Sequence, residues 1–106
     1  MVPLSSNTRL RLDALFAEPD RQKAADLIAE RCAEKLPFVS AAGPRVKGGK
    51  VTPESLERLR FAVLKLSSGD LGKLEVALRV AEEDWRDSLV AAGFDVDVKA
   101  HLSWWP

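Results

Sequence analysis

The chain has 106 residues, and its 16 Lys and Arg balance its 16 Asp and Glu, so the formal net charge is zero. Hydrophobic residues make up 46% of it, which excludes a disordered tail, and neutrality gives no general attraction to nucleic acid or anionic membranes. One Cys excludes both an internal disulfide framework and a zinc site built on several cysteines. We expect one cytosolic domain (residues 1–106) without a cofactor or metal.

The first half contains two amphipathic segments. Residues 7–17 are predicted to form a short helix that Asn7 caps and that ends before Pro19. Asp20 is then expected to cap a second helix, which continues to about residue 36. Its apolar side recurs every four residues and includes Cys32, so a buried, inert thiol is the favoured interpretation.

A long connection follows at residues 37–51, where three Gly and two Pro interrupt the helical pattern. It carries three basic residues and no acidic one: Arg45, Lys47 and Lys50. Such a patch can touch phosphates, but it has no aromatic residue on which bases would stack. A solvated loop is the better interpretation, and nucleic-acid binding through these residues is the weakest hypothesis.

The second half predicts a helical hairpin. Pro53 marks the start of a third helix that runs to about residue 66, and Gly69 and Asp70 mark its end and the cap of the next. The fourth helix is expected over residues 71–92, with Gly93 after its end and Trp85 on its inner seam. The short link between two apolar stripes predicts an antiparallel hairpin over 53–92.

The predicted fold class is mainly α: a small bundle of four to five helices built on this hairpin. Residues 94–105 fit two templates. Apolar and polar residues alternate as in a strand, whereas a short helix would place Val98, Leu102 and Trp105 on one face. A lone strand needs a partner, so we favour the helix.

Polar residues near the end of the fourth helix allow one catalytic hypothesis. Asp84, Arg86, Asp87 and the single histidine, His101, would surround a pocket near Trp85 in a small enzyme or ligand-binding domain. No nucleophile or phosphate-binding motif accompanies them. The acids also stand at helical spacing from arginines, as in the pairs Glu75–Arg79 and Glu82–Arg86. A solvated helix face therefore explains the acidic run better than a metal site.

Three aromatic residues are left without a place in the apolar stripes: Phe61, Trp104 and Trp105. Phe61 falls among charged residues of the third helix, so either the first two helices or a second subunit covers it. The consecutive Trp104 and Trp105 either close the core or lie on a partner's surface, and Trp is favoured at interface hot spots. The best functional hypothesis is a non-enzymatic interaction module that binds itself, as a homodimer, or another protein.

The second half also carries a resemblance. Asp84-Trp85-Arg86-Asp87, then Ala92-Gly93-Phe94, then His101 followed by Trp104, is similar to a pattern in small uncharacterised bacterial proteins. The resemblance covers half of the chain and implies no activity and no catalytic or binding residue.

Overall fold

The computed structural model describes residues 3–32, 53–97 and 99–106. Within these ranges the chain is helical and contains no strand, which confirms a mainly α fold and a small helical bundle. The predicted loop at 37–51, with its basic residues, lies outside the described ranges. The elements are α1 (Ser6–Leu15), α2 (Asp20–Arg31), α4 (Pro53–Ser67), α5 (Leu71–Glu83), α6 (Trp85–Ala92) and the 3-10 helix η2 (Ala100–Ser103).

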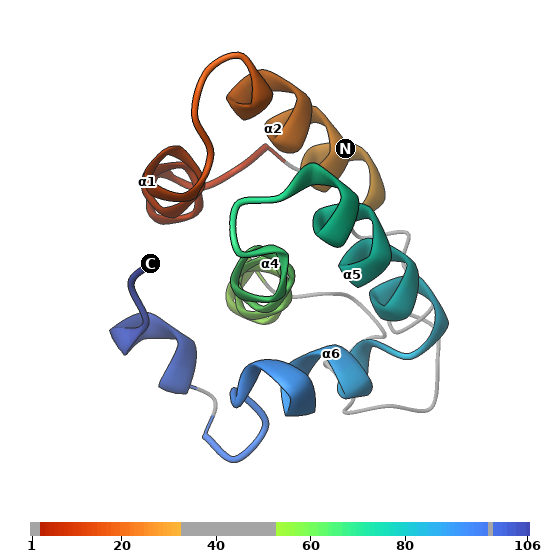
Figure 1. Cartoon of the computed structure of the whole chain (residues 1–106). Coiled ribbons are helices and arrows are strands. Elements are labelled where there is room, and N and C mark those ends of the chain that lie inside the picture. Colours follow the sequence, from red (N-terminus) through yellow and green to blue (C-terminus); the bar gives the residue numbers. More distant parts are fainter. Residues whose placement is uncertain (1–2, 33–52, 98) are drawn as a thin grey trace.

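Helix α4 is the centre of the bundle. It packs against α1, α5, α6 and η2, while α2 packs against α1 and α5. Figure 1 looks almost along α1 and α4, with α2 and α5 running across the view and the C-terminal end beside α1. The central position explains why α4 is apolar on more than one side. Its buried apolar side chains are Leu56, Leu59, Phe61, Ala62, Val63 and Leu64.

The turn between α4 and α5 follows the predicted stop and restart. Ser68 and Gly69 both have positive φ, at 51° and 82°. Asp70 caps α5, because its side chain accepts from the backbone N–H of Lys73 at 3.1 Å. Glycine is required at 69 for a second reason: a Cβ there would lie 2.5 Å from the carbonyl oxygen of Leu15. This contact docks the turn onto the end of α1.

The prediction of one continuous helix over 71–92 is wrong. The backbone of Asp84 is extended, with φ −154° and ψ 96°, and it ends α5 and begins α6. Its side chain accepts from the N–H of Arg86 at 3.1 Å, which makes Asp84 the N-cap of α6. The break also overturns the predicted Glu82–Arg86 pair: Glu82 accepts from Arg31 of α2 at 2.5 Å, and Arg86 lies 3.7 Å from Asp84.

The caps of the first two helices differ from expectation. Ser5, not Asn7, caps α1, and its hydroxyl accepts from the N–H of Thr8 at 3.1 Å. Asp20 is the first residue of α2 and Pro19 occupies the cap position, where no side chain bonds to the helix. Several short polar residues adjoin the start of α1, and the backbone path decides which of them caps the helix.

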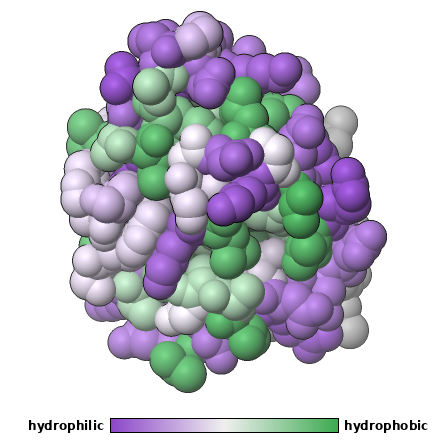
Figure 2. All heavy atoms as spheres, in the orientation of Figure 1, coloured by the Kyte–Doolittle hydropathy of each residue, from purple (hydrophilic) through white to green (hydrophobic). Residues whose placement is uncertain are grey.

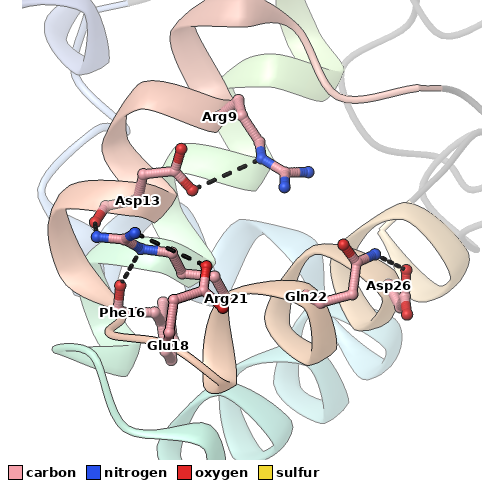
Figure 3. A network of polar contacts seen from close by, with 7 residues as sticks. All are labelled: Arg9, Asp13, Phe16, Glu18, Arg21, Gln22 and Asp26. Carbon is pink, nitrogen blue, oxygen red and sulfur yellow. Dashed lines mark hydrogen bonds and ion pairs between the residues drawn. The ribbon is translucent and has the colours of Figure 1, made fainter.

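Basic side chains from neighbouring segments satisfy the carbonyl groups at helix ends. Figure 3 shows Arg21 reaching back from α2 to the carbonyl oxygens of Phe16, at 2.7 Å, and Asp13, at 2.9 Å, at the end of α1. Arg60 donates to Cys32 after α2, and Lys65 donates to Ala92 at the end of α6, both at 2.8 Å. A positive group at a helix C-terminus is also favoured by the helix dipole.

The final segment is neither of the predicted alternatives in full. Its only regular element in the described residues is the four-residue η2, and the chain around it is irregular. The expected apolar face is wrong as well, because Leu102 and Trp105 are exposed while His101 is buried. A 3-10 helix turns every three residues, so it presents a different set of side chains to the core than an α-helix does.

Candidate functional site

The polar site considered from sequence is not assembled. Asp84 and Arg86 lie at the start of α6, where they serve as a cap and an ion pair, and Asp87 is exposed one residue further on. His101 packs on Phe94, which follows the other end of this helix. Eight residues of α-helix separate the two ends by about 12 Å, and Figure 1 shows η2 beyond the far end of α6.

The thiol of Cys32 is unsuited to chemistry. The side chain is completely buried, as its position in an apolar stripe predicts. Burial raises the pKa of the thiol to about 12, against the smaller opposing effect of Arg60. Because the thiolate is the reactive form, Cys32 is inert in the folded protein.

Phe61 is covered within its own chain, as one of the two predicted alternatives has it. The other alternative, cover by a second subunit, is wrong, and so is the place of Phe61 on an interaction surface. Its side chain is buried within the chain itself. The ring of His101 lies at 5.2 Å between centroids, that of Trp104 at 6.1 Å, and the guanidinium of Arg11 lies 4.4 Å from the Phe61 ring. Helix α1 and the C-terminal segment together cover this second apolar side of α4.

Arg11 organises the C-terminal segment and is the residue that the sequence analysis missed. Its Nε donates to the carbonyl oxygen of Trp104 at 2.9 Å, and a terminal nitrogen donates to that of Leu102 at 3.2 Å. The other terminal nitrogen donates to the backbone carbonyl oxygen of Asn7 in α1 at 3.1 Å. The same guanidinium lies 5.1 Å from the ring of Trp105. One side chain thus ties the chain end to α1.

A signal for this role does exist in the sequence. Thr8, Arg11, Leu12 and Leu15 follow the i, i+3, i+4, i+7 spacing of one helix face, and three of them are fully or almost fully buried: Thr8, Arg11 and Leu12. An arginine within an apolar stripe predicts a buried or stacked guanidinium. What the pattern does not contain is the identity of its partners, more than 90 positions away along the chain.

Trp104 and Trp105 differ in exposure, and only Trp104 closes the core. Trp104 is half-buried and packs between Phe61 and Phe94, at 6.1 and 6.2 Å between ring centroids. Trp105 is 55% exposed although Arg11 lies against its ring, and Leu102, three positions earlier, is 47% exposed. We call the exposed side chains of Leu102 and Trp105 the Trp105 surface, and it is the candidate functional site.

Two hollows lie elsewhere on the molecule. An open groove of about 650 Å³ runs between α1 and α2, and the exposed Leu10 lines it with Ala25 and Ala29. A smaller hollow of about 210 Å³ lies between the starts of α1 and α4, where the hydroxyl of Ser5 donates to Glu57. Figure 2 shows apolar residues in several separate areas of one face, divided by polar ones.

The described residues contain no group of three or more His, Cys, Asp or Glu placed to hold a metal ion. None of the helices that the structure describes combines the length and apolar character needed to cross a membrane. Comparisons of the chain with protein-family models, with curated proteins and with solved structures return no match.

Proposed function

We propose that the chain is a non-enzymatic protein–protein interaction module of the cytosol, and that the Trp105 surface is its contact site. One observation carries the proposal: an exposed tryptophan is held in place by a buried arginine. Arg11, with 9% exposure, lies against the Trp105 ring and bonds to the backbone on either side of Ser103. A side chain already ordered before binding loses less conformational entropy when a partner covers it.

The chemistry of the surface fits a partner with an apolar pocket. Tryptophan supplies a large apolar area with a single N–H donor, and it is enriched among residues that dominate binding energy. Leu102, three positions earlier in the same segment, adds a second exposed apolar side chain. A second copy of the chain and a different protein are both partners of this kind.

The test begins with self-association of the purified protein. Sedimentation velocity from about 1 to 500 µM should show a concentration-dependent dimer if the partner is a second copy. Trp105→Ala should then abolish the dimer. The matched control is Val76→Ala, because Val76 is 54% exposed on α5, away from the C-terminal segment.

If the protein stays monomeric, a photo-crosslinking amino acid at position 105, and separately at 76, identifies a different partner. The product must be specific to position 105. The identified protein, once purified, must bind the wild type and lose affinity at least tenfold with Trp105→Ala. Absence of both self-association and a position-specific product refutes the proposal.

A further inference from the structure

The C-terminal strap, which we define as residues 99–105, is attached by few elements. It follows the exposed stretch at 95–97, where Val96 is 87% exposed. Its described attachments are the Arg11 hydrogen bonds and the packing of His101 and Trp104 on the aromatic residues of α4 and of the α6 terminus. A segment with an exposed entry and few described attachments opens at a lower free-energy cost than the core helices do.

His101 is the deepest side chain of the strap. It is 3% exposed, and its ring meets Phe61 edge-on at 5.2 Å and Phe94 at 6.2 Å between centroids. Imidazole is the one side chain whose ordinary pKa, about 6.5, lies between pH 5 and 8. A proton taken up there adds a full charge among aromatic rings, and burial of a charge in such surroundings is costly.

The charged groups around the two rings are mostly positive. Arg11 of α1 lies over Phe61, Lys65 of α4 lies 5.0 Å from the Phe94 ring, and Arg58 of α4 donates to the Phe94 carbonyl oxygen at 2.9 Å. A protonated His101 would join these three cations. Repulsion between like charges then adds to the cost of burial.

The remaining charged groups near the strap are placed differently. Glu57 of α4 acts on Arg11 through space, and its carboxylate accepts from Ser5 at the start of α1. Asp95 and Asp97 precede the strap, Lys99 is its first residue, and all three are exposed. The Asp97 side chain accepts from the backbone N–H of Lys99 at 2.8 Å. Solvent screens these exposed charges more than the buried ones.

We propose that the C-terminal strap is a pH-sensitive latch: protonation of His101 releases residues 99–105 from Phe61, Phe94 and Arg11 while the helices stay folded. The proton comes from solvent and adds to the neutral imidazole, which the open strap exposes to water. Opening therefore takes up one proton, so a fall in pH below the ordinary histidine range favours the open form. In the open form Arg11 no longer holds Leu102 and Trp105 in place, so the Trp105 surface is lost as a binding site. This one consequence rests on the proposed function.

The chain is well suited to a direct test, because it has one His and three Trp. Nuclear magnetic resonance follows the single imidazole and the three indole N–H signals of the full chain from pH 8 to 5. The imidazole signal should show a single titration midpoint within this range. The signals of Trp104 and Trp105 should move with the same midpoint, while Trp85 and the backbone of α4 and α5 stay unchanged. Below that midpoint the closed-to-open ratio should fall up to tenfold per pH unit.

His101→Gln is the matched variant, since glutamine keeps a polar side chain and does not titrate. Its indole signals should stay constant over the same range. If this variant is already open at pH 8, the shared midpoint of the imidazole and the two strap indoles in the wild type decides the question.

Any one of three results would overturn the latch. The first is an imidazole that titrates near 6.5 while the indole signals do not move. The second is a His101→Gln variant with the same pH response as the wild type, and the third is a change of Trp85 and the helices together with the strap, which would be global unfolding. None of these measurements needs a binding partner, so failure of the latch and failure of the proposed interaction are separate results.

Discussion

Replacing Arg11 with methionine tests the tether on which both proposals depend. The change keeps an apolar stem of similar length within α1 and removes the guanidinium that joins α1 to the strap. Two hydrogen bonds to strap carbonyl groups are lost, those to Trp104 and to Leu102. The contact with the buried Phe61 ring, at 4.4 Å, is lost with them.

The expected loss of stability is about 2–4 kcal/mol. A hydrogen bond from a charged donor contributes about 1.5–3 kcal/mol, and a partly desolvated cation–π contact about 0.5–2 kcal/mol. Two effects reduce the sum. Leu102 is exposed, so water can reach its carbonyl region, and burial of Arg11 itself has a cost, which is visible as a lowered pKa that Glu57 only partly opposes.

The assay is urea unfolding of the full chain, followed by circular dichroism and compared at equal slope. Arg9→Met is the matched control, because Arg9 lies in the same helix, is 46% exposed and pairs with Asp13 at 3.6 Å. Such an exposed pair contributes at most about 1 kcal/mol. Arg11→Lys should lose most of the same stability, since an ammonium cannot reproduce the fork that spans two carbonyl groups. Equal midpoints for Arg11→Met and Arg9→Met would refute the tether.

Three further predictions concern single positions. Gly69→Ala should lower the free energy of unfolding in urea by at least about 2 kcal/mol, because a Cβ would lie 2.5 Å from a backbone carbonyl oxygen and φ is positive. The control is Gly72→Ala, whose Cβ would meet only the Asp70 side chain and should change stability by less than about 1 kcal/mol. Equal losses in the two variants would contradict the argument. Ser88→Ala should raise stability by about 1 kcal/mol, since its buried hydroxyl has no hydrogen-bond partner among the described residues, and a clear loss in thermal unfolding would show otherwise. Cys32, with a pKa of about 12, should resist iodoacetamide at pH 8 unless urea is present; rapid native labelling would exclude a buried thiol.

Local patterns predicted the helices and failed where the chain changes direction without a special residue. Gly69 and Asp70 mark their turn because one needs positive φ and the other caps. Asp84 carries no such mark, since an aspartate among charged residues suits both a solvated helix face and an N-cap. Packing of α6 against α4 decides in favour of the cap, and that contact joins residues far apart in sequence.

The candidate site was predictable in kind but not in composition. Trp104 and Trp105 stood out by their position and residue type, and one of them is exposed as an interaction surface requires. The spacing within one helix places Phe61 on a charged face but does not show which other segments cover that face. The side chains that cover it include Arg11 and His101, which belong to α1 and to the C-terminal segment.

A net charge of zero conceals an unequal use of the two signs. In the described part of the chain, Arg11 and Arg60 are buried, whereas every Asp and Glu is at least partly exposed. Arg21, Arg58 and Lys65 also donate hydrogen bonds to backbone carbonyl groups. The guanidinium fork makes this possible, because it bonds to several carbonyl oxygens while it stacks on a ring, whereas a carboxylate can only accept. The two signs therefore do different work: basic side chains hold helix ends and the strap through backbone carbonyl groups, whereas acidic side chains lie nearer the surface, where several cap helices or form ion pairs.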